Sequence, residues 1–499
     1  MAGVATFEGQ FINGSRSQGG SDETVEVLNP ATGEPVTRGN ASSGQDVDDA
    51  VAAANAAFGE WSRTTPAERS QIMHRWAVEL ETIADDLAAA ETEQAGKPIK
   101  LSTEFDVPGS IDNVAFFAGA ARHLEGKATA EYSGDHTSSL RREPIGVIGS
   151  IAPWNYPLQM AAWKILPAVA AGNSIVLKPA EITPLTSLMF AEAATRAGMP
   201  DGVINVVTGA GRSVGVALTT HPTVSMVSFT GSTPVGRSIA AAAAGKRLHL
   251  ELGGKAPFVV FDDADLEAAA NGAVAGALIN TGQDCTAATR AYVQRPLYNQ
   301  FVGAVADLMA TVRLGDTRDQ STDQGPLVSQ RQQQHVAGFV TRAVEDGAKV
   351  VRGGSIPGGP LERGYYYEPT LIVDAAQDSE IVQDEIFGPV LVVLPFDADD
   401  EGLALANDTP FGLAASAWSR DVYRAQRASR EIAAGCVWIN DHIPIISEMP
   451  HGGYKQSGYG KDMSAYSLDE YTNVKHVMTD ITGVARKRWQ RTIFGDRDA

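Results

Sequence analysis

IGVIGSIAPWNYPLQMAAWKILPAVAAGNSIVLKPAE, residues 145–181, predicts a strand, a helix and a second strand in succession. The short apolar runs 145–151 and 174–178 are typical of buried strands, and the longer run 158–172 is typical of a buried helix. Strands that alternate with helices favour a parallel sheet covered by helices on both faces. The stretch therefore predicts an α/β fold.

The same alternation continues toward the C-terminus. Further strands are expected at 203–207 and 225–229, and a second alternating series begins at 257–261 and runs to about residue 455. A chain of 499 residues exceeds the size of one hydrophobic core, so more than one domain is expected. Ligands of parallel sheets bind beyond the carboxyl ends of the strands. The loops expected there are APWNYP (152–157), KPAE (178–181), TGAGRSVG (208–215) and FTGSTPVG (229–236).

Other parts of the chain lie outside this alternation. The first part is predicted to be helical, with Thr65 as an N-cap, Pro66 in the first turn and Glu68 completing a capping box. An apolar stripe follows, and Gly96 and Pro98 are expected to end it; its members are Ile72, Trp76, Leu80, Ile83 and Leu87. The segments 126–142 and 470–499 cannot bury a core alone, and a strand-paired flap between subunits would explain them.

Composition excludes several classes of function. The chain is 43% hydrophobic, carries a formal charge of −20, and has no run of the about 20 apolar residues that a membrane span requires. The negative charge disfavours nucleic acid and anionic membranes as partners and is weakly compatible with a cationic substrate. The N-terminus lacks a basic segment followed by an apolar run, so we expect no secretory signal and a cytoplasmic location.

The two cysteines and nine histidines give no metal or disulfide pattern. We therefore expect no catalytic metal. Cys285 lies in GQDC (282–285), where glycine and polar residues suggest a loop with accessible backbone amides. A single cysteine is more often a small buried apolar residue than a nucleophile. The papain-type signature is absent, although a glutamine is near the cysteine.

Three further motifs close predicted strands. Glu251 ends the strand RLHLE before two glycines in ELGGK (251–255), which makes it either an exposed acid or a general base. In FTGSTP (229–234) the hydroxyls can cap a helix whose N-terminus favours a pyrophosphate, although GxGxxG is absent. Glu181 of KPAE is either a solvent-facing acid or a ribose ligand, and a carboxylate there favours NAD over NADP.

Taken in order, these motifs resemble the aldehyde dehydrogenase superfamily over essentially the whole chain. The matching runs are NPATGE (29–34), PWNYP (153–157), KPAE, FTGS (229–232), ELGGK, GQDC, EIFGPV (385–390), NDTPFGLAA (407–415) and GGYKQSG (452–458). The resemblance implies a Rossmann-like NAD-binding domain at 1–125 and 145–256 and an α/β catalytic domain at 257–454. It also implies small strand-built oligomerisation segments at 126–144 and 470–499, and a homodimer or homotetramer.

The resemblance implies a covalent mechanism. Cys285 attacks the aldehyde carbon as thiolate, and the Asn155 amide with the Cys285 backbone N–H holds the oxyanion, where one donor is worth about 3–4 kcal/mol. Hydride passes to the nicotinamide, and Glu251 activates the water that hydrolyses the thioester. Lys178 is also assigned to the catalytic residues. The cofactor residues implied are Ile151, Ala152, Pro153, Trp154, Lys178, Pro179, Ala180, Glu181, Gly211, Gly215, Phe229, Thr230, Gly231, Ser232, Val235, Leu252, Glu385 and Phe387.

Within the family, the chain looks closest to bacterial γ-aminobutyraldehyde dehydrogenases. The similar runs are SEMPHGGYKQSGYGKDMS (447–464), YYYEPT (365–370) and GQDCTAA (282–288). The residues that match substrate-tunnel positions are Asp106, Tyr156, Trp163, Ile279 and His451. Aromatic faces attract ammonium groups, so 4-aminobutanal, oxidised to 4-aminobutanoate in putrescine breakdown, is the expected substrate.

Some residues depart from that pattern and keep other substrates open. Ile279 and His451 stand where betaine-aldehyde enzymes have tryptophans, and Asp462 stands where many relatives have glutamate. Betaine-aldehyde and succinate-semialdehyde dehydrogenases are therefore alternatives. A Cys-dependent acyl transferase or hydrolase without a redox cofactor, and a non-catalytic relative, are alternatives of other classes.

Overall fold

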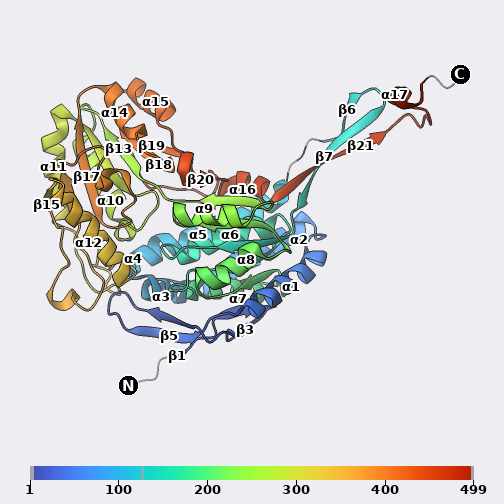
Figure 1. Ribbon diagram of the computed structural model, residues 1–499, viewed down its shortest axis with the longest axis horizontal. Helices are drawn as coiled ribbons and strands as arrows, with labels where there is room; N and C mark the ends of the chain where they lie inside the picture. Colours follow the sequence, from blue (N-terminus) through green and yellow to red (C-terminus); the bar gives the residue numbers. More distant parts are fainter. Residues whose placement is uncertain (1–4, 125, 127, 496–499) are drawn as a thin grey trace.

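Two large sheets form the body of the protein, and a narrow arm projects from it (Figure 1). The computed structural model describes residues 5–124, 126 and 128–495. Residues 1–4, 125, 127 and 496–499 of the predicted ranges 1–125, 126–144 and 470–499 lie outside the described residues, and they include the start of the N-terminus that we searched for a signal. In the part described, no helix combines the length and the apolarity needed to cross a bilayer.

The first sheet has eight strands, and five of them form its parallel centre. In order the strands are β20 (Gly458–Tyr459), β12 (Arg247–Glu251), β11 (Val224–Thr230), β8 (Val147–Ile151), β9 (Ser174–Lys178), β10 (Ile204–Val206), β2 (Gln10–Ile12) and β3 (Ser15–Ser17). Strands β12 to β10 are mutually parallel, whereas β20, β2 and β3 pair antiparallel at the two edges. The central strands match the alternation predicted from residues 145–251.

Helices cover both faces of this sheet. Along β9, Ile175 and Leu177 pack into one hydrophobic cluster and Val176 into another, because successive side chains of a strand point to opposite faces. One face carries α2 (Pro66–Thr82), α3 (Ala84–Ala95), α5 (Val107–Ala120), α6 (Pro157–Ala170) and α7 (Leu185–Arg196); the other carries α1 (Gly44–Trp61), α8 (Val216–Thr220) and α9 (Thr233–Ala242).

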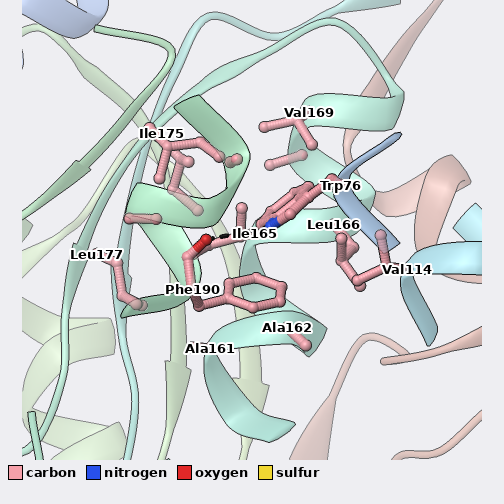
Figure 2. Close-up of a cluster of buried hydrophobic side chains, with 14 of the residues drawn as sticks. Trp76, Val114, Ala161, Ala162, Ile165, Leu166, Val169, Ile175, Leu177 and Phe190 are labelled. Carbon is pink, nitrogen blue, oxygen red and sulfur yellow. Dashed lines mark hydrogen bonds between the residues drawn. The ribbon is translucent and has the colours of Figure 1, made fainter. Parts of the chain in front are cut away.

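Helix α6 is buried along its whole length and is fixed by an aromatic contact between its neighbours. Figure 2 shows Trp76 of α2 against Phe190 of α7, with Ile165 and Val169 of α6 beside them. The two rings lie 4.3 Å apart, and the Trp76 indole N–H donates to the Phe190 carbonyl oxygen at 3.1 Å. This packing fixes the helix that follows the loop APWNYP.

The second sheet has seven strands from residues 256–439. In order these are β15 (Lys349–Arg352), β16 (Thr370–Val373), β17 (Val390–Phe396), β14 (Ala288–Gln294), β13 (Ala256–Val260), β18 (Ala414–Trp418) and β19 (Cys436–Ile439), all parallel except β15. Its helices are α10 (Leu266–Leu278), α11 (Arg295–Met309), α12 (Gln330–Glu345), α13 (Glu380–Gln383), α14 (Asp399–Asn407) and α15 (Val422–Glu431).

The arm is a three-stranded antiparallel sheet built from segments far apart in the sequence. Strand β7 (His136–Pro144) pairs with β21 (Thr472–Asp480) along its length and with β6 (Ala130–Ser133) on its other side. Figure 1 shows this sheet extending away from the body, with α17 (Arg491–Phe494) near its tip. The predicted flap segments are thus strand-paired within one chain.

Two expectations for the N-terminal part are wrong. Residues 5–40 are not helical but contain β1 (Ala5–Thr6), β2, β3, β4 (Thr24–Leu28) and β5 (Pro35–Asn40). The long apolar stripe is divided between α2 and α3, because Ile83 leaves helical geometry at φ −117° and ψ 18°. The capping box of Thr65 and Glu68 and the end of α3 at Gly96 are confirmed.

Candidate active site

The strands of the first sheet bring five predicted residues to one edge. Ile151 pairs with Phe229 and Lys178, and Thr230 pairs with Glu251, all at the carboxyl ends of parallel strands. From β8 the chain continues to β9 and β10 on one side, and from β11 it continues to β12 on the other side. The strand order therefore reverses between β8 and β11, and the loops that follow these two strands flank this switch point. Such a point is where open α/β sheets bind ligands.

The loop after β11 offers unused hydroxyl groups at a helix N-terminus. Ser232 is the N-cap of α9, but its side chain caps no backbone amide, so the capping that we expected is wrong. The Thr230 hydroxyl is buried and has no hydrogen-bond partner among the described residues. Free amides and hydroxyls at a helix N-terminus suit a pyrophosphate, so these residues fit a dinucleotide.

Lys178 is buried at the end of β9 and lies beside a widened helical turn. Its ammonium donates to the Pro179 carbonyl oxygen at 2.7 Å, and burial lowers its pKa to about 8 although Glu181 opposes the shift. Glu181 itself is exposed. Gly211–Gly215 is a π-helical turn, and a Cβ on Gly215 would lie 3.7 Å from the Lys178 side chain. The turn therefore lies directly beside the lysine, with space for a Cβ in ordinary contact.

A left-handed turn presents the nucleophile. Asn280, Thr281 and Gly282 have φ of 48°, 58° and 69°, a run of left-handed residues that is unfavourable for a β-branched threonine. The Asn280 amide donates to the Asn155 and Gln283 carbonyl oxygens at 2.8 and 3.2 Å, and the Thr281 hydroxyl donates to the Gly325 carbonyl oxygen at 3.0 Å. These bonds hold the strained turn immediately before Cys285.

Two glycines of ELGGK let this turn approach β12. A Cβ on Gly254 would lie 2.1 Å from the Cys285 carbonyl oxygen, and one on Gly253 would lie 2.7 Å from the Glu385 carboxylate. The Gly254 N–H donates to that carboxylate at 2.8 Å. The Ser457 hydroxyl donates to the Gly253 carbonyl oxygen at 2.7 Å. The motifs ELGGK, GQDC, EIFGPV and GGYKQSG therefore meet around the cysteine.

The environment of Cys285 disfavours its thiolate. The residue is half-buried, and its pKa is raised well above the usual value by burial first and then by the charges of Asp284, Glu251 and Glu385. Burial also raises the pKa of Glu385 to about 7 and that of Glu251 well above its usual value. A proton acceptor or a substrate of positive charge would relieve this repulsion.

Asn155 has a free amide hydrogen near the cysteine. Its side-chain amide donates one hydrogen to the Gln283 carbonyl oxygen at 3.1 Å, which leaves the second for another acceptor. On the cofactor side, the rings of Trp154 and Phe387 meet edge to face at 5.2 Å, and Phe387 has a left-handed φ of 56°. Trp154 immediately precedes Asn155 in the same loop, and Phe387 packs against Trp154.

The remaining cofactor residues lie on the same loops. The Ala152 N–H donates to the Lys178 carbonyl oxygen at 3.0 Å, and the Gly231 N–H donates to the Glu251 carbonyl oxygen at 3.0 Å. Val235 is exposed on α9, whereas Leu252 is buried. Pro153, Pro179 and Ala180 complete these loops.

The predicted substrate acid Asp106 already has a cationic partner. Asp106 ends a π-helical turn and pairs with Lys97, and both side chains are fully buried. Burial raises the pKa of Asp106 to about 7, and the Lys97 charge opposes the shift. The Lys97 ammonium also lies 4.2 Å from the centre of the Tyr156 ring. One face of this predicted cation-binding ring is therefore occupied by the protein's own lysine.

Trp163 and His451 lie together, and Ile279 lies at the start of the nucleophile turn. The Trp163 and His451 rings are 5.1 Å apart, and the Trp163 indole N–H donates to the Asn113 side-chain oxygen at 2.8 Å. Burial lowers the pKa of His451 to about 4, so its ring is neutral near pH 7. Ile279 is half-buried at the end of α10.

Two residues of the site were missed from the sequence. Asp284 is partly exposed beside Cys285, accepts from the Tyr156 hydroxyl at 2.8 Å and from the Thr286 amide at 2.6 Å, and acts electrostatically on Cys285 and His451. His442 is buried and donates to the Thr286 carbonyl oxygen at 2.8 Å, which fixes the residue after the nucleophile. The signal that could have revealed Asp284 was its position directly before Cys285 in GQDC.

One group of described residues has the donor atoms for a metal ion. The ligand atoms of His249, Glu251 and Asp462 all lie within 4.8 Å of one another. However, the Lys164 ammonium lies 2.8 Å from Asp462, where it competes with a cation. The cluster therefore supplies no argument for a metal.

Comparisons with known proteins agree with this geometry. The model described as "Aldehyde dehydrogenase family" matches residues 17–477. DhaS of Bacillus subtilis (strain 168), provisionally described as an aldehyde dehydrogenase, is 41% identical over 94% of this chain and 95% of its own length.

Solved structures of similar proteins have the same fold. PnpE, crystallised with nicotinamide adenine dinucleotide, is 38% identical at a TM-score of 0.94, over 97% of this chain and 99% of its own. The betaine aldehyde dehydrogenase (betB) from Staphylococcus aureus, crystallised with NAD+, is 36% identical at a TM-score of 0.94, over 97% of each chain. The predicted fold class is confirmed, and the chain belongs to the aldehyde dehydrogenase family.

Proposed function

We propose that this NAD-dependent aldehyde dehydrogenase acts on a small aminoaldehyde, 4-aminobutanal in the first instance. Family membership and the NAD complexes of similar proteins support the enzyme class and the cofactor. The observation that carries the substrate proposal is the Asp284 carboxylate beside Cys285.

The charges around Tyr156 favour a cationic substrate. Asp284, Asp106 and Glu91 lie in this region, and the one cation among these partners, Lys97, is paired with both Asp106 and Glu91. Asp284 is left without a cationic partner among the described ion pairs. A substrate ammonium would therefore find its counter-ion at Asp284, whereas the carboxylate of succinate semialdehyde would meet repulsion.

The covalent chemistry follows from the positions of three side chains. The Cys285 sulfur adds to the aldehyde carbon, and the free Asn155 amide hydrogen with the Cys285 N–H stabilises the resulting oxyanion. When bound, NAD accepts the hydride that this carbon releases. Glu251 then accepts a proton from the water that attacks the thioester, the C–S bond breaks, and the carboxylic acid leaves while Cys285 is released as the thiolate.

A cationic substrate would also assist the nucleophile. The negative charge of Asp284 contributes to the raised pKa of Cys285. An ammonium group at Asp284 would offset that charge and favour the thiolate. On this proposal an acid beside the nucleophile, which is a disadvantage for neutral aldehydes, becomes an advantage for aminoaldehydes.

Betaine aldehyde is the second candidate, because it also carries a positive charge and a betaine aldehyde dehydrogenase is among the similar structures. A trimethylammonium group has no N–H to donate to Asp284 and depends on aromatic faces. Lys97 occupies one face of Tyr156, and residue 279 is isoleucine. These features favour a primary amine.

Substrate kinetics on two variants test the proposal. The wild type is assayed with 4-aminobutanal, betaine aldehyde, succinate semialdehyde and uncharged butanal, and so is Asp284→Asn. We expect kcat/KM for 4-aminobutanal to fall about 10- to 100-fold in Asp284→Asn, since a hydrogen bond to a charged group is lost, while butanal is unimpaired. Asp307→Asn, at an exposed aspartate of α11, is the matched control. A preference for succinate semialdehyde, or an equal loss for all aldehydes, would contradict the proposal.

We further propose a homo-oligomer assembled through the arm, with the domain limits given by the sequence. Exposed apolar side chains on β21 and after it support this assembly; they are Val474, Met478, Ile481 and Val484. Apolar side chains on a projecting strand are typical of an interface.

A further inference from the structure

Behind Glu251, three buried polar atoms face one another. They are Nε2 of His249, Oε1 of Glu251 and Oδ1 of Asp462, and none has a hydrogen-bond partner among the residues that the structure describes. The first and last of these atoms are 3.7 Å apart. Buried polar atoms are costly unless they are satisfied, so their convergence requires an explanation beyond packing.

The hydrogen bonds on the far side of His249 determine where its proton lies. The Tyr471 hydroxyl donates to the Ser228 oxygen at 3.0 Å, and that oxygen lies 2.8 Å from Nδ1 of His249. The Lys164 ammonium, which can only donate, lies 3.5 Å from the same nitrogen. Nδ1 therefore accepts, and Nε2 carries the hydrogen that points toward the two carboxylates.

The imidazole remains neutral in this position. Burial lowers the pKa of His249 well below its usual value, and the charges of Lys164 and Lys461 lower it further. The charged groups that face the cluster are Glu251 on β12, Lys164 on α6, and Lys461 and Asp462 on the loop after β20. His249 is thus a neutral N–H donor among two carboxylates and two ammonium groups.

The loop around β20 is shaped to admit these side chains. A Cβ on Gly460, which has φ of +94°, would lie 2.0 Å from the His249 ring, and one on Gly452 would lie 2.5 Å from Oε1 of Glu251. Only glycine fits at either place. Both ends of GGYKQSGYG (452–460) are therefore shaped to admit the base and its histidine neighbour.

We propose that His249 is a positioning residue for the general base: its Nε2–H donates to the Glu251–Asp462 pair, directly or through a shared water, and keeps one of the two carboxylates ionised at neutral pH. This inference rests on the proposed role of Glu251 in thioester hydrolysis. A donor to the ionised carboxylate favours that form, whereas two adjacent carboxylates without a donor disfavour it.

Two variants of His249 separate the donor from the rest of the imidazole. His249→Asn keeps an amide that can bond to Ser228 but is too short to reach the carboxylates. His249→Gln places an amide N–H near the position of Nε2. Each is compared with the wild type in single-turnover quench-flow with NAD and labelled butanal, where acid-precipitable label reports formation and hydrolysis of the acyl-enzyme across the pH range.

The donor role gives a specific pattern. For His249→Asn we expect the acidic limb of thioester hydrolysis to move up by about one pH unit, with acyl-enzyme formation nearly unchanged, and for His249→Gln we expect the wild-type profile. Equal profiles for Asn and wild type, or equal shifts for Asn and Gln, would overturn the inference. Because butanal is uncharged, the aminoaldehyde proposal is not involved. Failure of Glu251→Gln to slow hydrolysis would instead refute the role of Glu251 itself.

Discussion

At the scale of single residues, Cys285 is surrounded by groups that oppose its ionisation. Three carboxylates act on the thiol, and burial acts in the same direction. Two neighbouring segments supply what the chemistry requires in return: the loop after β8 gives an amide hydrogen from Asn155, and the end of β12 gives the carboxylate of Glu251. The reactivity of this cysteine therefore depends on the groups around it and on the charge of the substrate.

Replacement of the base should uncouple the two halves of the reaction. In Glu251→Gln we expect one equivalent of NADH per site and then arrest at the thioester, because the amide cannot accept a proton from water. Stopped-flow absorbance of NADH with butanal measures the burst. Cys285→Ala, which should bind NAD without producing NADH, is the control, and sustained turnover in either variant would refute the assigned roles.

Activity should rise with pH. Burial raises the pKa of Glu251, and its carboxylate accepts a proton only when it is ionised; the raised pKa of Cys285 has the same consequence for thiolate attack. The deprotonated forms gain population as pH increases, so kcat and kcat/KM should both increase between about pH 6 and about pH 9. A pH–rate profile with butanal measures this, and a maximum on the acidic side would contradict it.

What the sequence failed to reveal at this scale depends on contacts that form only when the chain folds. Cys285, Glu251 and Asn155 stand in motifs whose resemblance to the aldehyde dehydrogenase superfamily implied their chemistry. Lys97 pairs with Asp106 because the fold of the α3–α5 region brings them together. No local sequence pattern indicated that the Asp106 carboxylate already has a cationic partner within the protein. His249 has a potential role only because the fold places Gly460 and Asp462, which are more than 200 residues later in the sequence, beside its ring.

At the scale of elements, local signals predicted the starts of helices better than their interiors. Thr65 and Glu68 form the predicted reciprocal cap of α2, since this motif is complete within four residues. The break at Ile83 has no such signal, because the apolar spacing continues across it. One helix start is an exception: Ser232 occupies the N-cap of α9, but its side chain caps no backbone amide.

The cap of α2 gives a stability prediction. Thr65→Ala removes the hydroxyl that accepts from the Glu68 N–H, and it should lower stability by about 0.5–2 kcal/mol. Denaturant titration followed by circular dichroism measures the shift of the midpoint. Thr82→Ala is the matched control, since the Thr82 hydroxyl only donates to the Glu79 carbonyl oxygen at the other end of the helix. Equal effects of the two substitutions would contradict a role of the cap.

At the scale of the whole molecule, the parallel centre of the first sheet was predictable strand by strand, that of the second only as an alternating series that begins at β13, and the edges were not predictable. The alternation of apolar runs indicated β8, β9, β10, β11 and β13. Strands β2, β3 and β20 are only two or three residues long, too short for any periodicity, and they join the first sheet from opposite ends of the chain.

The arm gives a prediction about assembly. Met478→Asp would place a charge on the exposed apolar surface of β21, and we expect it to shift the protein toward smaller species in light scattering coupled to size-exclusion chromatography. Val422→Asp, at an exposed valine of α15, is the control and should leave the mass unchanged. An unaltered mass for Met478→Asp would count against the arm as the interface.

The pairing of β12 with β20 has a consequence for how the protein matures during synthesis. Glu251 lies opposite Gly458, and Asp462 and Tyr471 follow shortly after, so the surroundings of the base come from residues that the ribosome adds long after the sheet itself. A nascent chain can contain the nucleophile, the dinucleotide loops and most of both sheets and still lack a finished catalytic centre. The protein thus gains catalytic activity late in synthesis, when the segment from residue 458 onward packs against β12. Nascent chains stalled before residue 458 should be largely folded but catalytically inactive.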